Sequence, residues 1–175
     1  MQNNFFEKIK SKNTFPIKVG DYNFIDSALL EDGAVQIYYR SENYEFGYFT
    51  ITIYNYGVPI PNNLDDPNLL NEYEACKNVF TLMEKKQLYK NVKIIIDEPF
   101  CLTNSKNPEF LSCLLSYLHK AKSGEYFDEL STLYLRADNG YFHKIRFSTL
   151  LSEFDNSIDK IGIFLQGWLN FINKL

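Results

Sequence analysis

A chain of 175 residues is long enough for one domain that buries most of its apolar surface without disulfides or a metal. The net charge of −4 and the pI near 5.2 argue against broad, non-specific nucleic-acid binding, which needs clustered positive charge. Three cysteines without close spacing argue against a disulfide framework and against a zinc site.

The first fourteen residues are polar apart from Phe5, Phe6 and Ile9, and they predict a flexible arm or a short helix. Residues 15–175 are then expected to form a single domain. The arm lacks the apolar core of a signal peptide, and no run approaches the roughly eighteen apolar residues of a membrane span. We therefore expect a cytoplasmic protein that does not bind membranes.

Two alternating runs, at residues 35–41 and 48–56, predict antiparallel strands because only a short connection separates them. A helix is expected to begin at Asp66-Pro67, with the acid as N-cap and the proline in the first turn. One buried stripe follows at three- and four-residue steps: Leu69, Tyr73, Cys76, Phe80 and Met83.

The second half of the chain predicts strands over residues 91–97 and 110–119, then a hairpin over 130–149 and a final helix from Ile158. Gly162 and Gly167 lower the helix propensity of this last segment, which suggests a close backbone approach. Mostly neighbouring strands with two long helices predict an α+β domain, a mostly antiparallel β-sheet flanked by helices.

The hairpin register depends on the loop around Asn139-Gly140, a strong hairpin signal. A two-residue loop would place Leu135 opposite Lys144 and Leu133 opposite Arg146, so that each face would mix apolar and charged residues. A three-residue loop that starts at Asp138 gives one apolar face and one face of Tyr, Arg and Lys. We therefore predict the three-residue loop, with these pairs: Ala137 with Tyr141, Leu135 with His143, Leu133 with Ile145, Thr132 with Arg146, Tyr134 with Lys144, and Arg136 with Phe142.

Three segments resemble the PsbP-like α/β/α sandwich, and more closely an uncharacterised bacterial family with the same order of elements. They are FGYFTITIYNYG at 46–57, the helix after Asp66-Pro67, and LYLRADNGYFHKIRFST at 133–149. The resemblance implies the fold. It also implies that such domains mostly bind other proteins rather than perform chemistry.

No catalytic or metal-binding pattern stands out in the sequence. Cys113 and His119 share a strand face, but six residues along a strand separate them by about 20 Å. His143 is expected to be a satisfied, semi-buried side chain on the apolar face. We therefore expect no cofactor and no metal, and we lean against an enzyme, although the absence of a motif leaves that question open.

The most suggestive surface is the polar face of the hairpin, with Tyr134, Arg136, Lys144 and Arg146, continued by Tyr54 on a neighbouring strand. Aromatic and Arg side chains are enriched in protein interfaces. The leading hypothesis is a non-catalytic protein-binding module, such as a chaperone, an adaptor or an immunity-like protein.

Two alternatives stay open. The polar face can be purely structural, made of cross-strand pairs on an exposed or helix-covered sheet. The chain can also be a small-molecule-binding protein or an enzyme with a pocket between sheet and helix, in which Arg146 or Lys144 holds an anionic ligand near His119 or Asp97.

Overall fold

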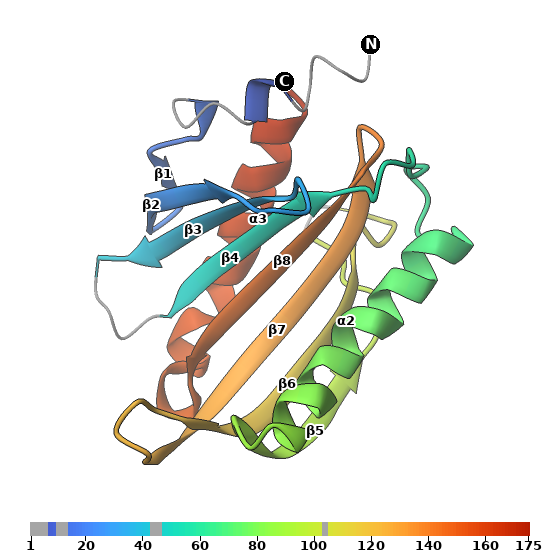
Figure 1. Ribbon diagram of the computed structural model, residues 1–175. Helices are drawn as coiled ribbons and strands as arrows, with labels where there is room; N and C mark the ends of the chain where they lie inside the picture. The colour runs from blue at the N-terminus through green and yellow to red at the C-terminus, as the bar shows by residue number, and fades with distance from the viewer. Residues whose placement is uncertain (1–6, 10–13, 43–46, 103–104) are drawn as a thin grey trace.

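The computed structural model describes residues 7–9, 14–42, 47–102 and 105–175, which form an α+β domain around one eight-stranded antiparallel sheet. The strand order is β1-β2-β3-β4-β8-β7-β6-β5. The strands are β1 (Lys18–Val19), β2 (Tyr22–Leu29), β3 (Val35–Ser41), β4 (Tyr48–Tyr54), β5 (Tyr89–Asp97), β6 (Leu111–Lys120), β7 (Tyr126–Asp138) and β8 (Tyr141–Leu150). Two long helices, α2 (Pro67–Lys85) and α3 (Ile158–Ile172), flank the sheet (Figure 1).

The two helices lie on opposite faces and over opposite halves of the sheet (Figure 1). Helix α2 packs on the face of β5–β8 that carries Cys113, Leu115 and Leu133. Helix α3 packs on the other face, against apolar side chains of β2–β4 and β8 such as Ile51 and Phe147. We call these the α2 face and the α3 face. Each face therefore has one half that lies under its helix and one half that does not.

Helix α2 confirms the prediction for residues 66–83. The Asp66 side chain accepts a hydrogen bond from the Asn68 backbone N–H at 2.9 Å, and Pro67 stands in the first turn. The predicted stripe faces the sheet, because Leu69, Tyr73, Cys76 and Phe80 are buried and Met83 packs at their edge. The acid and the proline thus fix where the helix starts, and the stripe fixes which side it buries.

Helix α3 confirms the close approach that its glycines predicted, at one of the two positions. A Cβ atom on Gly167 would lie 2.7 Å from Cγ1 of Val19 on β1, whereas nothing lies within 4 Å of the same position on Gly162. Two aromatic rings anchor the helix to the sheet, since Phe164 stacks on Phe49 with ring centroids 3.7 Å apart. Gly167 therefore lets α3 lie directly against β1.

The β7–β8 register that we predicted is wrong. Asp138 pairs with Tyr141, so Asn139-Gly140 forms a two-residue loop in which both residues have positive φ. Leu135 lies opposite Lys144 and Leu133 lies opposite Arg146. The assumption of one apolar and one polar face fails because a helix covers part of each face, so both faces of the hairpin carry buried side chains.

The N-terminal arm is described only in part. Residues 7–9 are helical, Ile9 is buried in the core under α3, and the Lys8 ammonium donates to the backbone oxygen of Leu175 at 2.6 Å. Residues 1–6 and 10–13 of the predicted arm lie outside the described residues.

Strand β5 forms the long free edge of the described sheet, since β1 at the other edge has only two residues. Its pairing with β6 shifts register twice, between Lys90 and Lys93 and between Ile94 and Ile96. Three consecutive isoleucines, Ile94, Ile95 and Ile96, are exposed there. In the part of the chain that the structure describes, no helix is long and apolar enough to cross a membrane.

Candidate functional site

The five predicted binding residues do not form one surface. The pairing of β4, β8 and β7 puts Tyr54, Lys144 and Arg146 on the α2 face, and Tyr134 and Arg136 on the α3 face. The prediction of a single polar face was therefore wrong, for the same reason as the predicted β7–β8 register. A change of one residue in the pairing reverses the face of every side chain on one strand.

Tyr134 and Arg136 occupy structural positions on the α3 face. Tyr134 is buried and packs edge-on against the rings of Phe100 and Phe110, at 5.1 and 5.9 Å between centroids. Arg136 forms an ion pair with Asp138 at 2.8 Å. Neither side chain offers its polar group to a partner protein. The alternative of a purely structural role therefore describes these two residues best.

Arg146 lies at the centre of a hydrogen-bonded cluster on the α2 face. Its Nε donates to Ser131 Oγ at 2.8 Å, and its Nη2 donates to the hydroxyls of Tyr117 at 2.6 Å and Tyr89 at 3.1 Å. The guanidinium also lies 4.7 Å from the centroid of Phe80 on α2. Four elements thus hold this side chain in one orientation.

A buried carboxylate completes the cluster. Glu129 accepts a hydrogen bond from the Tyr117 hydroxyl at 2.6 Å, and its other oxygen lies 2.8 Å from Nδ1 of His119. Its distance to the nearest Arg146 nitrogen is longer, at 3.9 Å. The sequence predicted His119 only as a neighbour of a possible pocket, and the structure brings it to this cluster through the β6–β7 pairing.

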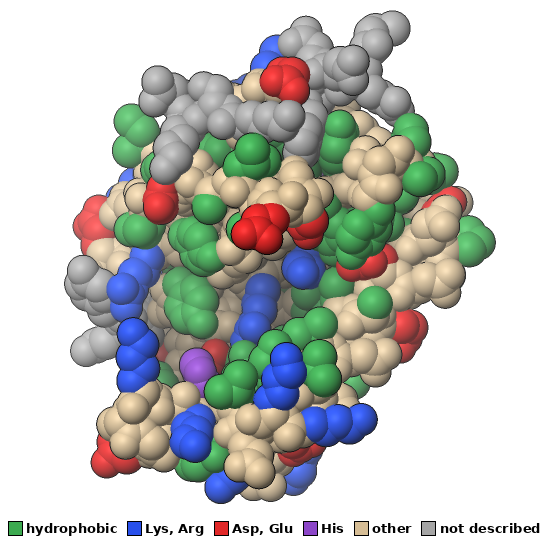
Figure 2. Space-filling model, in the orientation of Figure 1, with side chains coloured by type: hydrophobic (Ala, Val, Ile, Leu, Met, Phe, Trp, Pro, Cys, Tyr) green, Lys and Arg blue, Asp and Glu red, His purple; other side chains and the backbone are tan. Residues whose placement is uncertain are grey.

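Lys144 and Tyr54 lie one step further along the same face. The Lys144 ammonium is 5.5 Å from the centroid of the Tyr54 ring, and no carboxylate of the described residues forms an ion pair with it. The Tyr54 hydroxyl donates to Glu72 on α2 at 2.6 Å. Figure 2 shows Lys and Arg side chains at the bottom of a hollow on this face, beside α2.

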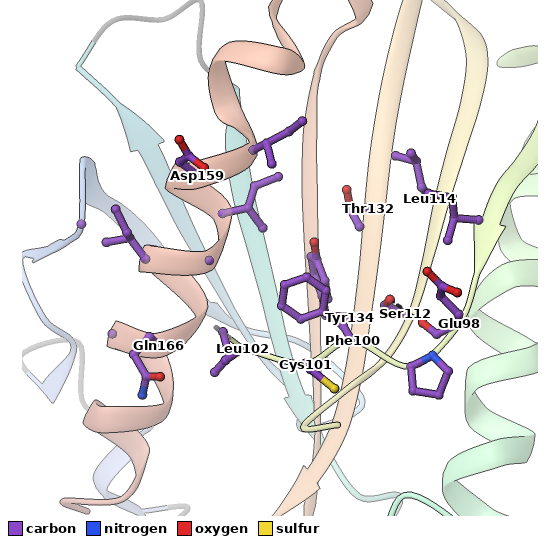
Figure 3. Close-up of a pocket in the computed structure, with 18 of the residues that line it drawn as sticks. Glu98, Phe100, Cys101, Leu102, Ser112, Leu114, Thr132, Tyr134, Asp159 and Gln166 are labelled. Carbon is purple, nitrogen blue, oxygen red and sulfur yellow. Dashed lines mark hydrogen bonds between the residues drawn. The ribbon is translucent and has the colours of Figure 1, made fainter. Parts of the chain in front are cut away.

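A groove lies on the opposite, α3 face, with a volume of about 1000 Å³. Its floor is formed by β5–β7, one wall is α3, and the segment 98–102 lies at one end (Figure 3). The side chains that line it are mostly apolar. They include Ile96, Phe100, Leu102, Leu114, Tyr134, Phe154, Ile158, Ile161 and Ile163.

The polar groups of the groove lie mainly toward its sides. Figure 3 shows Asp159 on α3 and Glu98 across the sheet from it. Among the described residues, neither carboxylate forms an ion pair. Both are therefore available to a positively charged group of a bound molecule.

Cys101 is exposed and lines the groove. The other two cysteines are buried, and burial raises the pKa of Cys76 and of Cys113 to about 11. Their thiols are consequently protonated at neutral pH and unreactive. Cys101 is thus a selective chemical handle in the groove.

His143 is buried completely rather than partly. Its strand partners are Ile53 and Arg136, so it lies on the α3 face and not opposite Leu135 as predicted. Burial lowers the pKa of His143 to about 4, with the charge of Asp138 acting in the opposite direction. In the described part of the chain, no group of three His, Cys, Asp or Glu side chains is placed to hold a metal ion.

The sequence did not locate the groove, since the alternative of a pocket between sheet and helix was placed at Arg146 and Lys144, and only Tyr134 of the predicted binding residues lines it. Cys101 and Leu102, from the connection between β5 and β6, lie at its end, and Phe100 and Phe110 pair just beside it. One local feature of the sequence did indicate exposed apolar side chains in this region. The run Ile94–Ile96 has no alternation, so a strand at that position must leave apolar side chains outside a one-sided core.

Comparison with known proteins gives a structural likeness. The sequence matches no protein-family model and no curated protein. Among solved structures, it is similar to the solution structure of cyanobacterial PsbP (CyanoP) from Synechocystis sp. PCC 6803. The TM-score is 0.45 and the identity 11%, over 87% of this chain and 94% of that chain. At this TM-score and identity, the likeness carries no inference about fold family or function.

Proposed function

We propose that the chain is a non-catalytic binding protein that takes an amphipathic helix of another protein into the groove on the α3 face. The observation that carries the proposal is the groove itself, where the half of the sheet beside α3 has no helix of the described residues over it. A sheet normally buries its apolar face against a second layer. The partner helix would supply that layer.

The dimensions of the groove suit a short helix. Its wall on α3 runs from Ile158 to Asn170, which is about 18 Å of helix axis and matches about twelve residues of a partner helix. Ile158 and Ile163 of α3 and Ile96 of β5 are exposed along its sides. These isoleucines would pack against apolar residues that recur at three- and four-residue steps.

Two carboxylates beside the groove define the charge that the partner should carry. Glu98 and Asp159 lie on the two sides of the groove without ion-pair partners in the described structure, and the chain as a whole is acidic. Lys or Arg residues at the borders of the partner's apolar stripe would complement them. The proposed partner is thus a basic amphipathic helix of a protein, and the chain would serve it as a chaperone, an adaptor or an immunity-like protein.

A second candidate is a small apolar molecule in the same groove. A volume of about 1000 Å³ is at the upper end of the range for small-molecule sites, and Ser112, Thr132 and the Tyr134 ring line the floor. The two candidates differ in how much of the groove they cover. A helix would contact both Ile158 and Asn170, whereas a small ligand would contact the floor alone.

The test uses a synthetic helix of Leu and Lys with an amphipathic pattern, and a scrambled peptide of the same composition. We expect the patterned peptide to bind and to slow alkylation of Cys101, and the scrambled peptide to do neither. Ile163→Asp should weaken binding at least about tenfold, because it places a carboxylate against the apolar stripe. Ile25→Asp is the matched control, since Ile25 and Ile163 are both 59% exposed and Ile25 lies on β2.

Equal binding of both peptides, or equal loss in both variants, would refute the helix site. Alkylation of Cys101 that is slowed by small apolar molecules, but not by the patterned peptide, would select the second candidate. A photo-crosslinking residue at position 163, with position 25 as control, should then capture the partner in living cells. A cross-linked protein found at position 163 alone, and through a basic amphipathic segment, is the expected result.

A further inference from the structure

We propose a second, independent site in the hollow of the α2 face, which binds a small organic anion through its carboxylate or phosphate group. Arg146 and Lys144 would hold the anionic group, and the tyrosines at the opening would contact the body of the molecule. This site lies on the opposite face of the sheet from the groove on the α3 face, so neither proposal depends on the other.

The orientation of Arg146 is fixed before any ligand binds. Ser131, Tyr89 and Tyr117 occupy its Nε and Nη2 groups, and Phe80 stacks against one side of the guanidinium. Its Nη1 group makes no hydrogen bond with any described residue, and it is not enclosed within the protein. One end of a rigidly held guanidinium therefore remains able to donate to an anion.

Neither cation in the hollow has a carboxylate of the described residues within close hydrogen-bond distance. Glu129 is the carboxylate near Arg146, but it lies 3.9 Å away and already accepts from Tyr117 and contacts His119. Glu72, on α2, accepts from Tyr54 and does not form an ion pair with Lys144. The other hydrogen-bond partners of Arg146 are neutral hydroxyls, which orient its charge without neutralising it.

Two cationic side chains lie close together here in a protein with a net charge of −4. Lys144 and Arg146 are two residues apart on β8, so both side chains leave the strand on the same face, about 7 Å apart at the backbone. The Arg146 side chain is only 27% exposed, and this partial burial strengthens its attraction to an anion relative to an open surface. An anionic group between them would accept hydrogen bonds from the Nη1 group of Arg146 and from the Lys144 ammonium.

The tyrosines at the opening define the rest of the ligand. Tyr48 on β4 is 38% exposed and Tyr38 on β3 is 36% exposed, and both project from the α2 face. Thr50 lies between Tyr38 and Arg146 across the sheet, and Tyr48 is its neighbour on the same face of β4. A ring or a short apolar chain attached to the anionic group could pack on these tyrosines. The ligand class is therefore an aromatic or apolar carboxylic acid or phosphate ester.

The test uses four probes at millimolar concentration: benzoate, phenyl phosphate, inorganic phosphate and the neutral benzamide. Binding is followed by NMR shifts of the backbone amides of β4 and β8. We expect saturable shifts with benzoate or phenyl phosphate, weaker ones with inorganic phosphate, and none with benzamide. A preference for phenyl phosphate over benzoate would identify the phosphate class, and the reverse would identify the carboxylate class.

Two charge-removing variants test whether the probes bind at Lys144 and Arg146. Lys144→Gln should weaken binding about tenfold, the effect of losing one charge-assisted contact. Lys122→Gln removes the same charge from an exposed turn and should change nothing. Arg146→Gln should abolish binding, and because it can also disturb the fold, Lys144→Gln remains the decisive variant. Benzamide that binds like benzoate, equal behaviour of the two lysine variants, or no saturable shift with any probe would overturn the proposal.

Discussion

The halves of the sheet that lie under a helix differ from the halves that do not. Under α3, aromatic rings from β2–β4 and β8 pack with Phe164 and Trp168, and none of these side chains reaches solvent. Beside the helices, the same sheet ends in a groove on one face and a hollow on the other. The comparison teaches that the covered halves hold the fold, whereas both binding sites that we propose lie beside the helices.

The largest loss of stability should come from a substitution in the covered half of the α3 face. Phe164→Ala removes a ring that stacks on Phe49 and meets Tyr22 and Tyr39 edge-on. We expect a loss of about 3–5 kcal/mol in the free energy of unfolding, from lost burial and the cavity left behind. Urea denaturation measures it. A loss below about 1 kcal/mol would mean that α3 contributes little to the core.

Acid should weaken the same covered half through His143. Its pKa is lowered to about 4 in the folded protein, against about 6.5 in the unfolded chain, so the unfolded state binds the proton more readily. Stability should therefore fall as the pH drops below about 6.5, by up to about 3 kcal/mol, and level off below pH 4. Urea denaturation across this range, with His143→Gln as the control, measures the slope. A variant with the same slope as the native protein would assign the loss to other groups.

A smaller effect is expected at the boundary between the covered and uncovered parts of the α2 face. Tyr117→Phe removes the hydroxyl that joins Arg146 to Glu129 and leaves the ring in place. The loss should be about 1–3 kcal/mol, because the buried Glu129 and the half-buried Arg146 each lose a hydrogen-bond partner. Thermal unfolding measures it, and Tyr126→Phe, which removes an exposed hydroxyl bonded to the Gln87 carbonyl, is the control.

The smallest effect should appear beside the groove. Ile163→Ser should change the free energy of unfolding by no more than about 0.5 kcal/mol, because more than half of this side chain is exposed to solvent. Denaturation of this variant beside Phe164→Ala compares adjacent residues on the two sides of α3. Equal losses would show that the covered and uncovered halves do not differ in the way described.

The sequence predicted the order of elements well because each element carries its own periodicity. The helix after Asp66 and its stripe, the β3–β4 hairpin and the helix from Ile158 all appear where their patterns placed them. The α+β class follows from that order. These features depend on residues that are close in the chain, so local physics is sufficient to find them.

The β7–β8 register and the site could not be predicted in the same way, because both depend on where the helices lie across the sheet. Leu133 and Arg146 are cross-strand partners on the same face of the sheet. Leu133 packs in the core cluster with α2, whereas Arg146 joins a polar cluster. No local pattern gives that position. The groove was missed for the same reason, since its walls come from α3, from β5–β7 and from the segment at 98–102.

The two register shifts in β5 have a consequence for how the protein behaves at high concentration. A long free edge with three exposed isoleucines is the kind of strand on which sheets of separate molecules join and polymerise. The shifts at Lys90–Lys93 and Ile94–Ile96, together with the left-handed backbone of Asn91, break the regular spacing of its outward N–H and C=O groups. The edge is thereby protected against fibre growth while its isoleucines stay exposed.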